Sequence, residues 1–208
     1  MKQIIKDALI LFVITAAAGI LLAFVNEATK GPIAEQEEQM RREAFQAVFA
    51  DAQEFTVQPL PELSEEESAA FTEAHPRNVI DEVNAAYDAS GNLLGYVLTV
   101  TNKEGYGGEI QFVMGLRLDG TLNGISILNT SETVGLGLEA ENVLAPQFAG
   151  RQVEAFVYTK TGATADYEVD AISSATITTN AVVNGVNAGL AYFQNYLKVG
   201  SEGGMNVE

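Results

Sequence analysis

The chain has 208 residues, of which 47% are hydrophobic and 19% charged, and its formal net charge is −17 at pH 7. This length allows one substantial folded domain with appendages, and so apolar a composition excludes a disordered chain. The negative charge argues against a nucleic-acid-binding protein, which needs a basic surface, and against a peripheral protein held electrostatically on anionic lipid.

The chain contains no cysteine, and His75 is its single histidine. Without cysteine there can be no disulfide, no cysteine-ligated iron–sulfur cluster and no covalent c-type haem. One histidine also argues against a bis-histidine haem or a zinc site built on several imidazoles. We therefore predict no metal site, and we expect any redox chemistry to depend on an organic cofactor.

Residues 1–26 form the first predicted element, a membrane anchor. The segment Ala8–Val25 carries no charge, and as a helix it spans roughly 27 Å, enough to cross a bilayer core. A cleaved signal peptide and a buried core helix are the alternatives, but a signal peptide usually has an apolar region of only about 7–15 residues. Because Lys2 and Lys6 precede the span, we expect a single-pass protein of the cell membrane with a cytoplasmic N-terminus and an extracytoplasmic body.

Residues 27–77 are predicted to be an acidic helical connector. Apolar residues recur at helical spacing in the segment Ala34–Phe49, which predicts an amphipathic helix, and Pro59 and Pro61 stop such a pattern. Ser64, followed by three glutamates, is typical of a helix cap and first turn. The acidic residues are most simply a solvated face; collection of cations is the alternative that we do not favour.

Residues 78–199 are predicted to form the main domain, and the glycine-rich tail 200–208 is expected to be frayed. Strands are predicted over Val79–Tyr87 and Leu93–Thr101, over Gln111–Leu118 and Leu122–Leu128, and over Gln152–Tyr158. The first four strands form two hairpins because turn residues separate them. A helical stripe over Asn180–Leu197 closes the domain. The fold class is therefore α+β: a single transmembrane helix, then an antiparallel sheet with flanking helices.

Three segments of this domain could bind a ligand. Gly105-Tyr106-Gly107-Gly108 permits a close backbone approach to a flat or anionic group, although a tight loop explains it equally well. Ser131–Gly137 combines hydroxyls with glycines and could equally be an ordinary polar loop. Asp170–Thr179 contains five hydroxyls before a helix, where backbone N–H groups and the helix dipole favour a phosphate. A helix cap, the alternative, needs only one hydroxyl.

Together the three segments carry a family resemblance. Asp170-Ala-Ile-Ser-Ser-Ala-Thr176 resembles the flavinylation motif of the FMN-binding domain family, which includes the G subunit of Rnf complexes and the C subunit of sodium-pumping NADH:quinone oxidoreductases. Ser131–Gly137 is similar to the family's E-T-P-G-L-G loop, and Gly105–Gly108 to its Gly-Tyr loop. The resemblance implies FMN joined to Thr176 by a phosphoester bond that a separate flavin transferase installs. The remaining implied cofactor residues are Ser173, Ala175, Asp170, Thr178, Glu132, Thr133, Gly135, Leu136, Tyr106 and Gly107.

Two positions depart from the family's pattern. Ser174 stands where the family has glycine, so a positive φ there would be strained and loading by the transferase less efficient. Val134 replaces a proline. Asp170 is expected to guide the transferase and its metal rather than to contact the flavin ring.

The resemblance implies a membrane-anchored flavoprotein that relays electrons in an ion-translocating ferredoxin:NAD oxidoreductase of the Rnf type. Its partners would be integral membrane subunits and iron–sulfur or flavin subunits. No G-x-G-x-x-G fingerprint follows a predicted strand, so we expect no NADH oxidation by this chain alone and assign no catalytic residue. The alternatives are a component of a Na⁺-translocating NADH:quinone reductase-like complex and a non-redox extracytoplasmic module that has lost the flavin.

Overall fold

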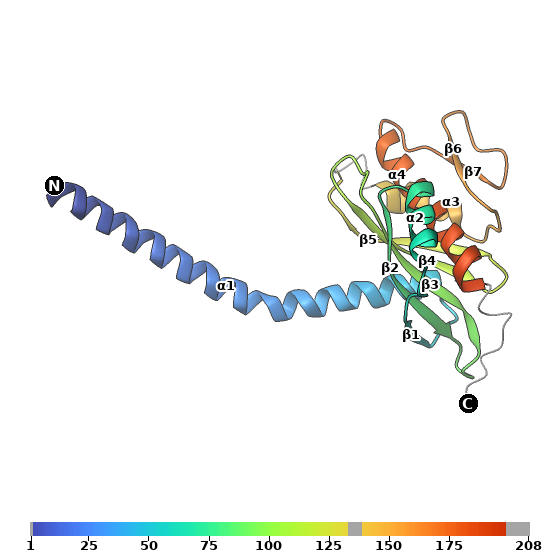
Figure 1. Ribbon diagram of the computed structural model, residues 1–208, viewed down its shortest axis with the longest axis horizontal. Coiled ribbons are helices and arrows are strands. Elements are labelled where there is room, and N and C mark those ends of the chain that lie inside the picture. Colours follow the sequence, from blue (N-terminus) through green and yellow to red (C-terminus); the bar gives the residue numbers. More distant parts are fainter. Residues whose placement is uncertain (1, 133–138, 199–208) are drawn as a thin grey trace. The chain divides into compact units, whose positions relative to one another are not determined.

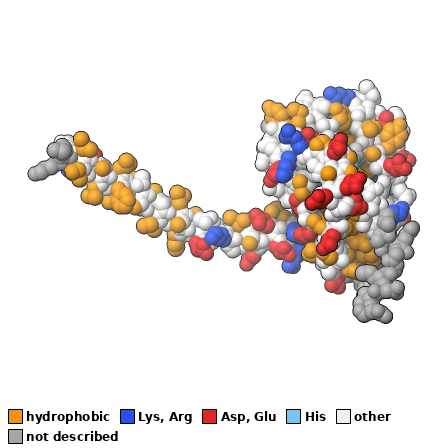
Figure 2. All heavy atoms as spheres, in the orientation of Figure 1, with side chains coloured by type: hydrophobic (Ala, Val, Ile, Leu, Met, Phe, Trp, Pro, Cys, Tyr) orange, Lys and Arg blue, Asp and Glu red, His pale blue; other side chains and the backbone are white. Residues whose placement is uncertain are grey.

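The computed structural model describes residues 2–132 and 139–198 (Figure 1). The chain divides between Arg42 and Glu43 into two compact units. Most of helix α1 (Lys2–Val48) forms the first unit. Figure 2 shows hydrophobic side chains along the N-terminal part of this helix, and those of Phe12, Leu22 and Phe24 are exposed. Within the described residues, α1 is the one helix long and apolar enough to cross a membrane.

Helix α1 differs from the prediction by its continuity. The sequence predicts an apolar helix over Ala8–Val25 and a separate amphipathic helix over Ala34–Phe49, whereas one helix runs through both and contains Pro32. A proline removes only one backbone hydrogen bond from a helix, and the many turns on either side of Pro32 maintain the helical path.

The second unit is built on a five-stranded antiparallel sheet with strand order β1-β2-β3-β4-β5. The strands are β1 (Glu54–Gln58), β2 (Asn78–Tyr87), β3 (Leu93–Asn102), β4 (Ile110–Arg117) and β5 (Leu122–Thr130). Both predicted hairpins are confirmed. The first turn is ordered by Asp88, whose Oδ1 accepts hydrogen bonds from the amides of Ser90 and Asn92, both at 2.8 Å. Strand β1 was not predicted.

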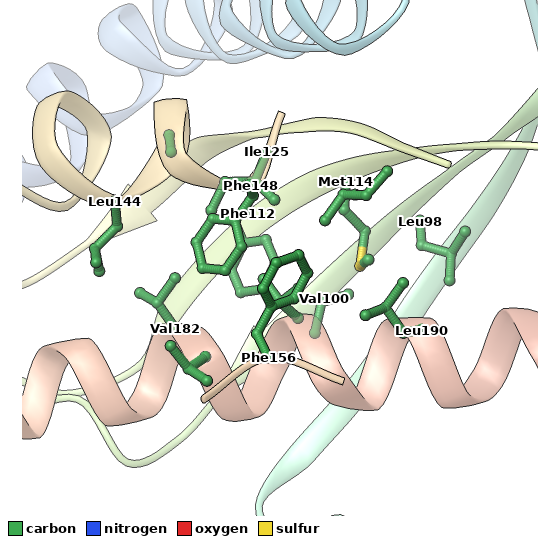
Figure 3. Packing of buried hydrophobic residues seen from close by; sticks show 14 of the residues in the cluster. Leu98, Val100, Phe112, Met114, Ile125, Leu144, Phe148, Phe156, Val182 and Leu190 are labelled. Atoms are coloured by element: carbon green, nitrogen blue, oxygen red, sulfur yellow. The ribbon is translucent and has the colours of Figure 1, made fainter. Parts of the chain in front are cut away.

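One face of the sheet packs against α4 (Thr176–Tyr192) and against the short helical segments η2 (Ala140–Leu144) and α3 (Ala145–Phe148). Figure 3 shows Phe112 and Met114 of the sheet directed toward Val182 and Leu190 of α4. These side chains belong to a core cluster that lies between the sheet and the helices. The predicted α+β architecture, an antiparallel sheet with flanking helices, is confirmed.

The other face of the sheet packs against the end of α1. Phe45, Val48 and Phe49 form a second apolar cluster with Val97 and Val113 of the sheet. The second unit therefore begins at Glu43 and also contains β1 and α2 (Glu65–Ala74), both of which lie in the expected connector 27–77. This start is earlier than the expected boundary at residue 78, because the apolar end of α1 covers this face of the sheet.

The predicted cap of α2 is confirmed. The amide of Glu67 donates to Ser64 Oγ at 3.2 Å, and the amide of Ser64 donates to Glu67 Oε2 at 2.9 Å, which is a capping box. These bonds lower the pKa of Glu67.

The predicted strand Gln152–Tyr158 is wrong in its extent. A short strand β6 (Val157–Thr159) pairs in parallel with β7 (Glu168–Asp170). Residues before Val157 do not extend strand β6, because the side chain of Asn187 on α4 is hydrogen-bonded to both the amide and the carbonyl of Phe156. Asn187 Oδ1 accepts from the Phe156 amide at 2.7 Å, and Asn187 Nδ2 donates to its carbonyl at 2.9 Å.

The closing helix also differs from the prediction at both ends. Helix α4 begins at Thr176 rather than Asn180 and ends at Tyr192, and a π-helical turn (Phe193–Leu197) completes the predicted stripe. Three hydroxyl residues of the candidate phosphate segment therefore belong to the first turn of the helix: Thr176, Thr178 and Thr179.

Candidate functional site

The path of α4 along the sheet brings the candidate segments to one end of the domain. A Cβ added to Gly185 would lie 2.8 Å from the Phe112 ring, and one added to Gly189 would meet the Met114 side chain. Helix α4 therefore runs in the same direction as β4. Gly185 and Phe112 lie at the same level. From this level Thr176 is roughly 13 Å back along the helix, whereas the first residue of β4 is only about 7 Å back along the strand.

The helix thus starts beyond the first residue of β4. At this end of the sheet lies the β3–β4 loop, which carries Tyr106, and here Ile110 pairs with Thr130 at the end of β5. Figure 1 shows the start of α4 and the β3–β4 loop at the same end of the domain. The Gly-Tyr loop, the start of the Ser131–Gly137 segment and the start of α4 therefore lie at one end of the sheet.

A compact turn precedes α4. Ser174 has φ 64°, the strained conformation that the departure from glycine at this position raised as a concern. The Ala175 amide donates to the Ile172 carbonyl at 3.1 Å. The Thr179 hydroxyl accepts from the Ile172 amide at 3.1 Å and donates to the Ala175 carbonyl at 2.9 Å. The turn is thus fixed from inside by a hydroxyl of the helix that it opens.

The five hydroxyls of this segment occupy three environments. Thr178 and Thr179 are 1% and 0% exposed. Ser173 and Ser174 are exposed and precede the helix, whereas Thr176 is half-buried at its first position. Burial removes Thr178 and Thr179 from direct reaction with a large ligand. Among the threonines of the motif, Thr176 is the one whose hydroxyl combines access with the helix terminus.

The N-terminus of α4 has no side-chain cap. Its N-cap residue is Ala175, and no side-chain hydrogen bond caps the helix. The first N–H groups of a helix have no partner within the helix and lie at the positive end of its dipole. This terminus can therefore bind an anion held at Thr176.

Asp170 orders the neighbouring loop. Its Oδ1 accepts a hydrogen bond from the Ala163 amide at 2.7 Å. Its backbone is fixed by Gln147, which accepts from the Asp170 amide at 2.6 Å and donates to the Asp170 carbonyl at 3.2 Å. Sequence reasoning missed Gln147, because a glutamine in an unpredicted helix carries no local signal of such a contact.

The Gly-Tyr loop and the start of the Ser131–Gly137 segment touch each other. A Cβ on Gly107 would clash with the Ser131 carbonyl, and one on Gly105 would lie 2.7 Å from Glu132 Oε1. Close contact between the two backbones therefore requires glycine at position 107, and Gly105 leaves room for the Glu132 side chain. The Tyr106 side chain between them is 71% exposed. Thr133, Gly135 and Leu136 lie outside the described residues.

Glu132 is a buried acid, 7% exposed. Its Oε1 has no hydrogen-bond partner among the residues that the structure describes. This atom lies against the Gly105 backbone and is enclosed by protein, so any contact with a ligand would have to involve the other carboxyl oxygen.

Two exposed apolar side chains belong to these segments. Ile177, next to Thr176, is 53% exposed, and Tyr106 is 71% exposed. The site therefore combines an accessible hydroxyl, a helix terminus that favours an anion, and apolar surface suited to a flat aromatic ring.

Family models match two parts of the chain. The FMN-binding domain matches residues 105–191, from the Gly-Tyr loop through most of α4. The RnfG N-terminal region matches residues 1–48, that is, Met1 and the whole of α1 (Lys2–Val48).

The chain is 34% identical to the G subunit of the Na⁺-translocating ferredoxin:NAD⁺ oxidoreductase complex of Acetobacterium woodii, over 95% of each chain. It is 30% identical to the G subunit of the ion-translocating oxidoreductase complex of Methanosarcina acetivorans, over 92% of this chain and 95% of that one. The corresponding Escherichia coli K12 protein is also 30% identical, over 93% of each chain.

Two solved structures share the fold. NqrC of Shewanella oneidensis is 17% identical with a TM-score of 0.59, and the match covers 81% of this chain and 99% of that one. The C subunit of the Na⁺-translocating NADH-quinone reductase of Parabacteroides distasonis is 16% identical with a TM-score of 0.53, over 78% and 94%. The extent of the sequence matches and the FMN-binding domain that they contain show that this chain belongs to the family of G subunits of ion-translocating oxidoreductase complexes.

Proposed function

We propose that the chain is a membrane-anchored flavoprotein that relays electrons in an ion-translocating ferredoxin:NAD oxidoreductase complex, with FMN esterified to Thr176. The observation that carries this proposal is the position of Thr176. It is the half-buried threonine at the first position of an uncapped helix, whereas Thr178 and Thr179 are buried. Attachment by the transferase joins Thr176 Oγ1 to the flavin-side phosphorus of a flavin dinucleotide: the diphosphate bond breaks, the adenosine monophosphate half leaves, and the threonine hydroxyl gives up its proton.

The residues present fit an FMN group. A phosphodiester at Thr176 retains a negative charge, which the N–H groups and dipole of the α4 terminus stabilise. The exposed side chains of Ile177 and Tyr106 offer apolar surface to the isoalloxazine ring. When bound, FMN supplies reversible one- and two-electron transfer, and the chain's own residues hold and orient it.

The backbone at Ser174 favours the flavoprotein over a module that has lost the flavin. Serine rarely adopts φ 64°, yet the motif keeps this conformation although the glycine is gone. The degree of identity supports the ferredoxin:NAD complex over the quinone reductase, because the A. woodii protein is 34% identical and the S. oneidensis NqrC 17%. The partners are then integral membrane subunits and subunits with iron–sulfur or flavin centres, and a flavin transferase matures the chain.

Helix α1 provides the anchor, with the N-terminus in the cytoplasm and the flavin domain outside. The chain has no cysteine, so one introduced thiol reports its own position. Ser68 on α2 is exposed and lies in the flavin-binding unit. Ser68→Cys in intact cells should react with a membrane-impermeant maleimide. Labelling only after the cells are opened would overturn this orientation.

Flavin attachment is tested by co-expression with a flavin transferase, followed by denaturing electrophoresis and in-gel flavin fluorescence. Thr176→Ala should lose the fluorescent band, whereas Thr178→Ala, which changes a buried hydroxyl of the same helical turn, should keep it. An intact mass without FMN in the co-expressed wild-type chain would contradict the proposal. So would a fluorescent band that persists in Thr176→Ala.

A further inference from the structure

Asn102, the last residue of β3, lies immediately before the segment that leads to the Gly-Tyr loop. It is 0% exposed, and both ends of its side-chain amide are hydrogen-bonded. Nδ2 donates to Asn78 Oδ1 at 2.7 Å, and Oδ1 accepts from the Glu104 amide at 2.8 Å. A buried amide that satisfies a backbone N–H two residues ahead specifies the conformation of that backbone.

Asn78 links this amide to the rest of the site. It is the first residue of β2, and its Nδ2 donates to the Pro76 carbonyl at 3.1 Å. Its Oδ1 lies 3.6 Å from the position that a Cβ on Gly185 of α4 would occupy. The Asn102–Asn78 pair therefore connects the first residues after β3 with β2, on the side of the sheet that contacts the helix carrying Thr176.

A backbone bond supports the same arrangement. The Lys103 amide donates to the Arg77 carbonyl at 3.0 Å. At the other end of the loop, Ile110 pairs with Asn102 across β3 and β4. Residues 103–109 are thus held at both ends, and the Asn102 side chain fixes the first turn of the path that presents Tyr106.

We propose that Asn102 is a positioning residue of the flavin site, acting through the Gly105–Gly108 loop to set where Tyr106 lies relative to the flavin on Thr176. This inference rests on the proposed attachment of FMN. A tyrosine ring in contact with an isoalloxazine quenches flavin fluorescence, because the phenol donates an electron to the excited flavin. The emission lifetime of the tethered flavin therefore reports the position of Tyr106.

The experiment compares full-length chains loaded by the transferase. Tyr106→Ala gives the unquenched reference lifetime. Asn102→Ala should keep the covalent band and lengthen the lifetime toward that reference. Asn78→Ala removes the less buried partner of the same 2.7 Å hydrogen bond and should also lengthen the flavin lifetime. The flavin lifetime in the Asn78→Ala/Asn102→Ala double variant should be no longer than in Asn102→Ala alone, since both residues act through one contact.

Asn84→Ala is the matched control. Asn84 is a buried asparagine of β2, 2% exposed, and its Nδ2 donates to Glu82 Oε1 at 2.6 Å rather than to the loop. It should lower the melting temperature without changing the flavin lifetime.

Equal lifetimes in wild type, Asn102→Ala and Asn78→Ala would overturn the inference, as would a change in Asn84→Ala as large as that in Asn102→Ala. A wild-type lifetime that Tyr106→Ala does not alter would also overturn it. In these cases the covalent band is still present, so the proposed function stands. A wild-type chain without the band overturns both. If Asn102→Ala does not fold, the lifetime of Asn78→Ala decides.

Discussion

The hydroxyl of Thr179 accepts a hydrogen bond from the amide of Ile172 at 3.1 Å, across the turn that opens α4. The same hydroxyl donates to the Ala175 carbonyl at 2.9 Å. Thr179 is completely buried, so this pair of bonds belongs to the interior. The turn that presents Thr176 is therefore held by another hydroxyl of the same motif.

Thr179→Val should destabilise the domain by about 2 kcal/mol, because it leaves the buried Ile172 amide without an acceptor. Urea denaturation of the unloaded chain measures this difference. Flavin loading should also fall, because the turn that presents Thr176 loosens. Thr178→Val is the matched control, since its hydroxyl takes no part in this pair of bonds and its loss should cost less. Equal losses from the two variants would contradict the assigned role of Thr179.

Ser174→Gly should stabilise the domain by up to about 1 kcal/mol. A side chain in the left-handed region is strained, and glycine removes this strain at the cost of a more flexible unfolded chain. Loading by the transferase should rise in parallel, as measured by in-gel fluorescence per unit protein. Ser173→Gly controls for the added flexibility, because Ser173 is not among the residues with positive φ. If Ser173→Gly raised stability and flavin loading as much as Ser174→Gly, relief of backbone strain at position 174 would not be the cause.

The sequence was sufficient where structure depends on neighbouring residues. Alternating apolar residues and turn residues predicted four strands of the sheet, and the Ser64–Glu67 cap follows from local chemistry. Contacts between distant segments were not predictable in this way. Asn187 stops the strand before Val157, and Gln147 fixes Asp170, although neither residue is a sequence neighbour of its partner.

The candidate site shows the same division. The family resemblance assigned the reactive hydroxyl to Thr176 from the sequence, and burial separates Thr176 from Thr178 and Thr179 on independent, structural grounds. The segment Asp170–Thr179 has more hydroxyls than a helix cap needs, but not all of them are free for a ligand. The Thr179 hydroxyl instead forms the hydrogen bonds that hold the turn before α4. A pattern of residue types cannot distinguish these roles, since both favour small polar side chains near a helix start.

Glu132→Gln should stabilise the unloaded chain by about 1 kcal/mol. Glu132 Oε1 is buried and has no partner among the described residues, and an unsatisfied buried carboxylate oxygen costs free energy. The change is best measured by thermal denaturation in the Thr176→Ala background, in which no flavin attaches. Glu109→Gln, at an exposed acid of the neighbouring loop, should have a negligible effect. A loss of stability in Glu132→Gln would show that the carboxylate is paired.

The loop between β6 and β7 should depend on pH through Glu168. Hydrogen bonds from the Thr164 backbone amide, the Ala165 amide and the Thr164 hydroxyl lower the pKa of Glu168 below its ordinary value. A lowered pKa means that the ionised form is favoured in the folded state. Its contribution is therefore fully present above the unfolded pKa of about 4.3 and disappears as the pH falls through the folded pKa.

Glu168→Gln should accordingly lower the melting temperature at pH 7. The difference from wild type should begin to shrink as the pH falls below the unfolded pKa of about 4.3 and should disappear once the pH is below the lowered, folded pKa. Because this carboxylate is exposed to solvent, the difference at pH 7 should be small. A difference that persists unchanged at low pH would mean that shape, rather than charge, accounts for the effect.

The glycines of α4 should differ in their tolerance of alanine. A Cβ at Gly185 would lie 2.8 and 2.9 Å from two atoms of the Phe112 ring, which is fully buried and cannot move aside. At Gly189 the added atom meets the Met114 side chain, which has several rotatable bonds and can repack. Gly185→Ala should therefore cost about 2 kcal/mol in unfolding free energy. Gly189→Ala should cost less, because the Met114 side chain can repack. The gain of about 1 kcal/mol from replacing a helical glycine by alanine applies to both variants.

The functional consequence separates the two variants further. Gly185 contacts Phe112 and lies within reach of Asn78, so an added methyl group displaces α4 from the end of the sheet that carries the Gly-Tyr loop. Thr176 would then move relative to Tyr106, and the lifetime of the tethered flavin should change in Gly185→Ala. In Gly189→Ala the repacking is confined to Met114, farther along the helix, and the lifetime should remain that of the wild type. A wild-type lifetime in Gly185→Ala would mean that the start of α4 is positioned independently of its packing on β4.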